Sequence, residues 1–299
     1  MHRKGSVLIM VLIVISAVLA ISISVMEMNS GLYYDVNVLK NHSQTNVYAF
    51  TIAKAAYQII SEDKNGFDSL EDLWATEITY PMENGYVNAI IKPINRKIDL
   101  NLFLKGDEGT IKRLFDVADR IYQEKGIPQE LFHKIADYID NDTKTNAYGN
   151  ETLPYYVNGR QIQVKNKRLD TIQELRVIFE EYGSVREYTS IFTAGDSEKR
   201  ININFASEDV LKFYLPEIGE FSSQIVEYRK RKPFKDISSI RNAIPIENDV
   251  YQKIIPFITV KSENFYLKIT IDNSGNLFYY HALINRKDGV KLLFEGNNE

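Results

Sequence analysis

Hydrophobic positions are most dense at the start of the chain. Residues 6–26 carry no charge and are mostly Val, Ile, Leu, Met and Ala, with Arg3 and Lys4 before them and Glu27 after them. At about 1.5 Å per residue, a helix of this length crosses the ~30 Å hydrocarbon layer of a bilayer. Positive flanks stay in the cytoplasm. We therefore predict one membrane-spanning helix, with everything after Glu27 outside the cytoplasm.

A secretory signal peptide is the alternative interpretation of this run, since it also has a basic start and an apolar stretch. Signal-peptide apolar stretches usually cover about 7 to 15 residues and end at a small-x-small cleavage site. The run here is longer, and the nearest candidate site, Val18-Leu19-Ala20, lacks the first small residue. The pattern favours a helix that is retained in the membrane.

The helical pattern continues beyond the apolar run. Apolar residues recur at three- and four-residue steps, which places them on one face of an amphipathic helix: Val47, Phe50, Ala53, Tyr57 and Ile60. Residues 29–31 (Asn-Ser-Gly) are expected to kink or fray the join. We predict one long helix, buried in lipid at its start and packed on a globular body at its end.

Two kinds of pattern alternate in the rest of the chain. Strands are predicted at residues 86–93 and 97–102, and three more within 265–294, where apolar and polar side chains alternate. Turn residues at 273–276 and 286–289 make the last three strands an antiparallel meander.

Residues 106–256 have the apolar spacing of helices. Apolar stripes at 111–121 and 131–139 predict two of them, and further helices are predicted at 171–182, 207–215, 222–232 and 248–255. Asp170, Ser207 and Ser222 are the predicted N-caps of three of these helices.

Together these patterns predict an α+β fold. A long N-terminal helix packs on a small antiparallel sheet, and a large all-helical domain is inserted between strands. The predicted body comprises residues 27–105 and 259–299, and the insertion comprises residues 106–258. The strands on either side of the insertion must therefore meet across it.

Composition narrows the functions that the chain can have. Its 299 residues are 44% hydrophobic and 25% charged, which predicts globular cores. The net charge of −4 gives no general attraction to phosphate, and the absence of cysteine excludes disulfides and thiol chemistry. Four histidines are scattered (His2, His42, His133 and His281), and no common catalytic motif occurs. We predict that the protein is not an enzyme.

The N-terminal residues resemble those of type IV pilins and pseudopilins. A short basic leader ends at Gly5, and the uncharged run follows. The resemblance implies that a prepilin peptidase cuts between Gly5 and Ser6, that the new terminus is methylated, and that the mature helix bundles with its neighbours in a filament. Most members have a glutamate at the fifth mature position, which here is Met10. Minor pseudopilin K of the type II secretion system is the member that lacks it, and a subunit at the tip has no subunit above it to pair with.

Later segments resemble the same pseudopilin K family. They are residues 137–142 (DYIDND), 149–156 (GNETLPYY), 166–177 (NKRLDTIQELRV) and 201–211 (ININFASEDVL). The resemblance implies a pilin fold with a large helical insertion, in a single-pass inner-membrane protein whose bulk is periplasmic. Its implied partners are the I and J minor pseudopilins, with which it would cap the pseudopilus and help to start its assembly. A type IV pilus minor pilin is a related alternative.

The acidic stretch at the start of this region is a candidate calcium site. Asp140, Asp142 and Glu151 occupy the first, third and twelfth positions of an EF-hand loop, and calcium prefers such oxygen ligands. Lys144 and Thr145 at the fifth and sixth positions exclude a true EF-hand. The residues alone favour helix capping and a solvated acidic turn, whereas the family resemblance implies calcium here. Both interpretations stay open.

Residues 201–240 also resemble a helix-hairpin-helix DNA-binding module, so a membrane-anchored DNA-binding protein of the competence type is the main rival function. Such modules bind phosphates through a G-x-G turn, but Gly219 is the one glycine at this hairpin. Residues 200–240 hold seven basic and six acidic side chains, a surplus too small to drive phosphate binding at physiological salt. We predict a solvated helix end at 229–232 and no nucleic-acid partner.

Overall fold

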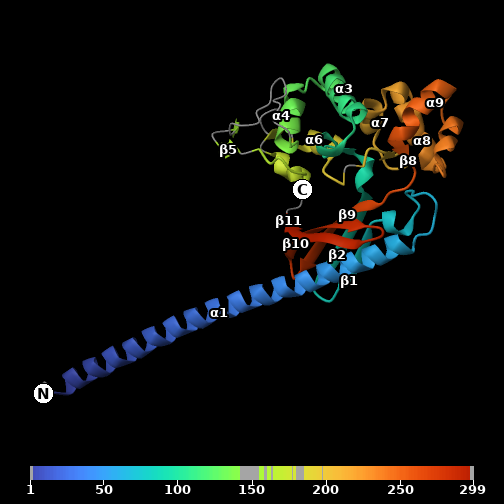
Figure 1. Cartoon of the computed structure of the whole chain (residues 1–299). Helices are drawn as coiled ribbons and strands as arrows, with labels where there is room; N and C mark the ends of the chain where they lie inside the picture. Colours follow the sequence, from blue (N-terminus) through green and yellow to red (C-terminus); the bar gives the residue numbers. More distant parts are fainter. Residues whose placement is uncertain are drawn as a thin grey trace.

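The computed structural model describes residues 3–141, 155–157, 160–162, 164–176, 178–179, 185–196 and 198–296 (Figure 1). One helix, α1 (Arg3–Glu62), spans 60 residues; its C-terminal part lies along the sheet and its N-terminal part extends away from the body. The helix runs through residues 29–31 without interruption, so the expected fraying there is wrong.

The sheet has five antiparallel strands in the order β1-β2-β9-β10-β11. They are β1 (Ile78–Met82), β2 (Gly85–Pro93), β9 (Asn264–Asn273), β10 (Asn276–Asn285) and β11 (Gly289–Gly296). Strands β2 and β9 pair along their whole length, from Gly85 opposite Asn273 to Pro93 opposite Phe265. The predicted meeting of strands across the insertion is confirmed, as is the three-strand meander.

Small side chains allow α1 to lie close to the sheet. Thr45, Ala49, Ala53, Ala56 and Ile60 are buried at steps of three or four residues, and they face the alternate apolar residues of β9. Val47 and Phe50, which were expected on this face, are 63% and 48% exposed. The expectation was wrong because α1 carries two apolar stripes, and only the alanine-rich one contacts the sheet.

Local chemistry explains where the strands begin and end. The β9–β10 loop has positive φ at Ser274 (58°) and Gly275 (82°), as a two-residue type I′ hairpin requires. The strand expected at 97–102 is shorter: β3 covers only Ile98–Asp99, and helix α2 (Leu102–Lys105) follows. Edge strand β1 was not predicted, because it contains Pro81 and is largely exposed.

The segment between β2 and β9 contains two modules, and each begins and ends with a short strand and has helices in between. The first runs from β3 through α3 (Glu108–Lys125), α4 (Glu130–Ile139), the hairpin β4 (Tyr155–Val157) and β5 (Arg160–Ile162), η3 (Ile172–Leu175) and α6 (Val185–Ile191) to β6 (Phe192–Thr193). The second runs from β7 (Ile201–Asn202) through α7 (Glu208–Tyr214), η4 (Pro216–Phe221), α8 (Ser222–Arg231), η5 (Ile237–Asn242), α9 (Asn248–Ile254) and η6 (Ile255–Phe257) to β8 (Ile258–Thr259). The predicted α+β fold is confirmed, and the inserted segment adds short strands to its helices.

Each module is closed in the same way. Its first and last strands pair in parallel, β3 with β6 and β7 with β8. Two residues beyond the first strand, a buried asparagine holds distant backbone together. Asn101 donates to the oxygens of Leu169 (3.0 Å) and Gly195 (2.8 Å), and Asn204 donates to those of Asp68 and Phe234 (both 2.8 Å). The inserted segment is therefore an internal structural repeat.

The helix starts agree in part with the sequence. Ser207 caps α7 by accepting from Val210 N at 3.2 Å, as expected. Thr171 rather than Asp170 is the N-cap of η3, because Thr171 and Glu174 form a capping box. Ser222 is already inside α8, after Phe221 at the N-cap position. The helix predicted at 171–182 begins as η3, and part of it lies outside the described residues.

Over the described residues, the structure contains no helix that is both long and apolar enough to cross a membrane. The spanning segment at residues 6–26 stays a prediction.

Candidate interaction surfaces and metal sites

The most extensive exposed apolar surface follows α1. At 100° per residue, one set of exposed apolar side chains falls within an arc of about 100° around the helix axis. We call this set the α1 stripe: Val18, Ile21, Val25, Met28, Val36, Leu39, Val47 and Phe50, which are each 47–67% exposed. The stripe ends at Lys54, whose ammonium lies 4.5 Å from the centre of the Phe50 ring.

The two halves of the stripe have different surroundings. Near the N-terminal half, Leu19, Ile23 and Met26 are also exposed, at 56–72%, on other sides of the helix. In the C-terminal half, the exposed apolar side chains that the structure describes lie within this arc, and the sheet covers the alanine-rich face. A helix that is apolar all around suits lipid, and one with a single exposed apolar stripe suits packing against another helix.

Charged side chains fix the junction between the sheet and the inserted segment. Asp68 is fully buried, and its Oδ1 accepts from Arg286 at 2.6 Å and from Lys261 at 3.1 Å. Its Oδ2 accepts from the backbone nitrogen of Ser262 at 2.6 Å. Burial raises the pKa of Asp68, although both cations oppose the shift. The cluster joins the segment after α1, the β10–β11 turn and the β8–β9 loop that leads back from the insertion.

Within the described ranges, one group of carboxylates is close enough to share a metal ion. Oxygens of Asp63, Asp68 and Asp72 lie within 4.8 Å of one another. The guanidinium of Arg286 lies 3.3 Å from Asp63, and Lys261 contacts both Asp63 and Asp68. Because these two cations already neutralise the group, we interpret it as a structural ion-pair cluster.

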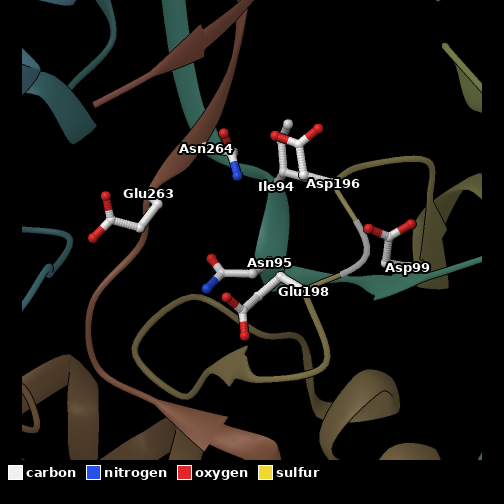
Figure 2. Close-up of a pocket in the computed structure, with 7 residues that line it drawn as sticks. All are labelled: Ile94, Asn95, Asp99, Asp196, Glu198, Glu263 and Asn264. Atoms are coloured by element: carbon white, nitrogen blue, oxygen red, sulfur yellow. The ribbon is translucent and has the colours of Figure 1, made fainter. Parts of the chain in front are cut away.

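A small acidic cleft lies beside the same junction (Figure 2). Its lining residues are Ile94, Asn95, Asp99, Asp196, Glu198, Glu263 and Asn264. Asp196 pairs with Arg168 (3.0 Å) and Lys291 (3.2 Å), which lowers its pKa against the opposing effect of burial. Glu198 pairs with Arg200 at 3.0 Å, and Glu263 with Lys287 at 3.4 Å. These carboxylates tie the inserted segment to β11 and to its own loops.

The sequence-predicted site residues are placed as follows. Gly5, Ser6 and Met10 lie within α1, and Asp140 is the C-cap of α4. Asp142 and Glu151, the other predicted calcium ligands, lie outside the described residues. Cleavage at Gly5 and calcium binding at Asp140 therefore stay predictions.

The described histidines have separate packing roles. His42 on α1 contacts Glu295 of β11 at 2.8 Å. The ring of His133 stacks on Phe115 with centres 4.8 Å apart, and burial lowers its pKa. His281 is buried, and its Nδ1 shares a hydrogen bond with the hydroxyl of Tyr266.

The hairpin-like segment 201–240 consists of β7, α7, η4, α8 and most of η5. Gly219 is needed at its turn, because a Cβ there would lie 3.0 Å from the backbone oxygen of Lys212. Arg229 donates to the oxygen of Ile203 at 2.6 Å, and burial lowers its pKa to about 10. The predicted solvated helix end is thus wrong for Arg229, which packs inward, and correct for the exposed Lys230, Arg231 and Lys232. When the inward-facing Arg229 is left out of the count, the segment no longer has more basic than acidic side chains.

Comparison with known proteins gives a likeness to a solved structure. No protein-family model and no curated protein sequence matches the chain. Among solved structures, the chain resembles GspK in the crystal structure of the GspK-GspI-GspJ complex from the enterotoxigenic Escherichia coli type 2 secretion system. The TM-score is 0.73 at 16% identity, and the match covers 88% of this chain and 99% of that chain. The likeness includes the inserted segment as well as the sheet and helix, and it establishes a shared fold.

Proposed function

We propose that the protein is the minor pseudopilin K of a type II secretion system, located at the tip of the pseudopilus. The observation that carries this proposal is the match to GspK over 99% of that chain, at a TM-score of 0.73. A match of this extent requires both the long helix on a small sheet and the inserted pair of modules. Pilin-like proteins without the insertion would match only part of the chain.

The position at the tip follows from shape and charge. The inserted segment lies on the side of the sheet away from the N-terminal part of α1 (Figure 1). A subunit stacked above this one would collide with it. Met10 supplies no carboxylate for the terminal amine of such a subunit. Both features suit a subunit that caps the filament and helps to begin its assembly.

The α1 stripe is the proposed contact with the other minor pseudopilins. The related GspK was solved in complex with GspI and GspJ, so equivalent I and J subunits are the proposed partners here. Residues 6–26 would anchor the chain in the inner membrane after prepilin peptidase cleavage at Gly5, with the body in the periplasm. No catalytic step belongs to this function.

Coexpression of the full chain with candidate I and J pseudopilins tests the proposal. We expect the three proteins to copurify in detergent as one complex. Leu39→Glu and Val47→Glu place a charge in the stripe and should abolish copurification, because a charge in a packed helix contact is left without a partner. Gln44→Glu adds the same charge on an exposed position of α1 outside the stripe and should keep the complex.

Two results would contradict the proposal. The first is an absence of any complex with I and J proteins encoded beside this chain. The second is a salt-sensitive shift of duplex DNA by the purified full chain, which would favour the DNA-binding alternative.

A further inference from the structure

Three basic residues lie close together in the chain where β2 leaves the sheet, and the proposed function does not use them. Lys92 is the last basic residue of β2, in register with Tyr266 of β9. Arg96 ends the 3-10 helix η2 (Ile94–Arg96), and Lys97 follows it. The ammonium of Lys97 donates to the backbone oxygen of Thr189 on α6. The group, which we call the basic corner, therefore lies between the sheet and α6.

The basic corner is on the side of the sheet that α1 does not cover. Side chains alternate along β2, and Val87, Ala89 and Ile91 are the ones buried against α1. Lys92 follows Ile91 and points to the opposite side, where it is only partly buried. Arg96 and Lys97 are also partly buried. The three cations are thus shielded from bulk water while staying accessible.

The positive charge of this corner is not neutralised within the described part of the chain. Neither Arg96 nor Lys97 forms an ion pair there. Of the other partly buried arginines, Arg113 and Arg286 each contact a carboxylate at 2.6–2.7 Å, and Arg120 and Arg229 donate to backbone oxygens at 2.8 and 2.6 Å. Burial lowers the pKa of Arg96. Burial and the charge of Arg96 together lower the pKa of Lys97 to about 8.

Lys92 responds to the same surroundings. Its pKa is lowered by burial and then by Arg96, and only the charge of Glu77 opposes the shift. Glu77 is itself exposed and accepts a hydrogen bond from Asn88 at 2.6 Å. Shielded cations without counter-charges are costly, and such costs are usually retained where a charged ligand removes them.

We propose that the basic corner binds an oxyanion, either a small phosphate-like ion or the carboxylate of an acidic peptide. Arg96 supplies the planar fork of N–H donors that fits two oxygens of either group. Lys92 and the two remaining N–H donors of Lys97 supply further charge-assisted hydrogen bonds. The bound anion neutralises a cluster that the chain leaves positive.

Thermal unfolding of the detergent-solubilised full chain tests this site. Inorganic phosphate and a triglutamate peptide are the two probes, each compared with sodium chloride at equal ionic strength. We expect at least one of them to raise the melting temperature by about 3 °C at ten times its Kd. Phosphate as the stronger probe indicates a free ion, and the peptide as the stronger probe indicates an acidic segment of a neighbouring protein.

Arg96→Gln should remove the stabilisation without lowering the melting temperature in the absence of either probe, because it deletes a charge that forms no ion pair with the residues that the structure describes. Arg231→Gln, at an exposed position on α8, is the control and should respond like the wild type. If neither probe stabilises the wild type beyond chloride, or if Arg96→Gln responds equally, the site does not exist.

Lysine acetylation gives a readout that does not depend on stability. A depressed pKa makes Lys97 reactive towards acetic anhydride at pH 8, and a bound anion raises that pKa again. We expect the effective probe to slow acetylation of Lys92 and Lys97 severalfold in the wild type and to leave the exposed Lys230 unaffected. Equal slowing at all three lysines would indicate general screening and would overturn the proposal.

Discussion

Arg286 and Asp68 form a 2.6 Å ion pair between residues 218 positions apart in the sequence. Both side chains are nearly inaccessible, with 9% and 0% of their surface exposed. Arg286 also donates to the backbone oxygens of Ile60 and Ser262, both at 3.0 Å. One guanidinium thus joins the end of α1, the loop after it and the β8–β9 loop that returns from the insertion.

Removing one partner of this pair should destabilise the protein strongly. We expect Asp68→Asn or Arg286→Met to lower the free energy of unfolding by about 3–5 kcal/mol, because each leaves a buried group without its counter-charge. Asp288→Asn, at an exposed position in the same turn, should change it by less than about 0.5 kcal/mol. Urea denaturation of the purified chain measures all three. A small effect at Asp68 would show that Asp63 alone is a sufficient counter-charge for Arg286 and Lys261.

The two buried asparagines, Asn101 and Asn204, should contribute equally to stability if the inserted modules are a structural repeat. Asn101→Ala and Asn204→Ala each remove three buried hydrogen bonds to backbone groups. We expect a loss of about 3–5 kcal/mol in each case, since the backbone groups are left unsatisfied. Amide hydrogen exchange should then be faster in the module that carries the substitution than in the other module. Opening of both modules at the same rate in both variants would mean that they unfold as one unit.

The close approach of α1 to the sheet depends on small side chains. Ala53 is fully buried against the sheet, so Ala53→Leu should cost about 1–3 kcal/mol through overpacking. Val47→Leu, on the exposed stripe of the same helix, should have almost no effect on unfolding. Equal stability of Ala53→Leu and the wild type would show that α1 can move away from the sheet without cost.

The N-cap of α3 should give a pH-dependent contribution to stability. Hydrogen bonds from Thr110 and then from Lys199 lower the pKa of Asp107 to about 2, below its usual 3.8. A carboxylate with a lowered pKa stabilises the fold above its unfolded pKa, and this stabilisation is lost as the pH falls through about 2. The difference in melting temperature between the wild type and Asp107→Ala should therefore narrow between pH 4 and pH 2. A constant difference would assign the effect of Asp107 to packing.

Calcium binding near Asp140 follows from the family resemblance and is directly measurable. We expect calcium to raise the melting temperature of the wild type and to have no effect on the double variant Asp140→Asn, Asp142→Asn. Magnesium is the control ion, because it prefers a smaller octahedral site. If calcium has no effect on the wild type, the acidic turn is a solvated helix end.

The sequence predicted the elements whose side-chain period is regular. The alternation through Phe265 and Ile271 and the turn at Ser274-Gly275 fixed the meander, and the uncharged N-terminal run predicted a long helix. The period of α1 did not show which of its two apolar stripes is buried, so Val47 and Phe50 were placed on the wrong face. The buried stripe is the one whose small alanines fit against the sheet, and the sequence of the helix alone does not show this.

Other features of the structure could not be predicted from local sequence patterns. In residues 97–102 the alternating pattern predicts a strand, but the side chain of Asn101 binds distant backbone and ends β3 after two residues. The internal repeat was missed because its modules differ in length, 98–193 against 201–259. The basic corner joins residues of β2 and η2 to α6, and no known motif describes it. The sequence held one clue to the repeat. The two modules begin with similar four-residue segments, Ile98-Asp-Leu-Asn101 and Ile201-Asn-Ile-Asn204.

The register of β2 and β9 has an evolutionary consequence. Pro93 and Phe265 are opposite one another, so the chain leaves the sheet and returns to it at the same place. A segment of any length can be inserted there without changing the register of the strands. Such an arrangement lets the inserted segment change in length while α1 and the sheet keep the same pairing.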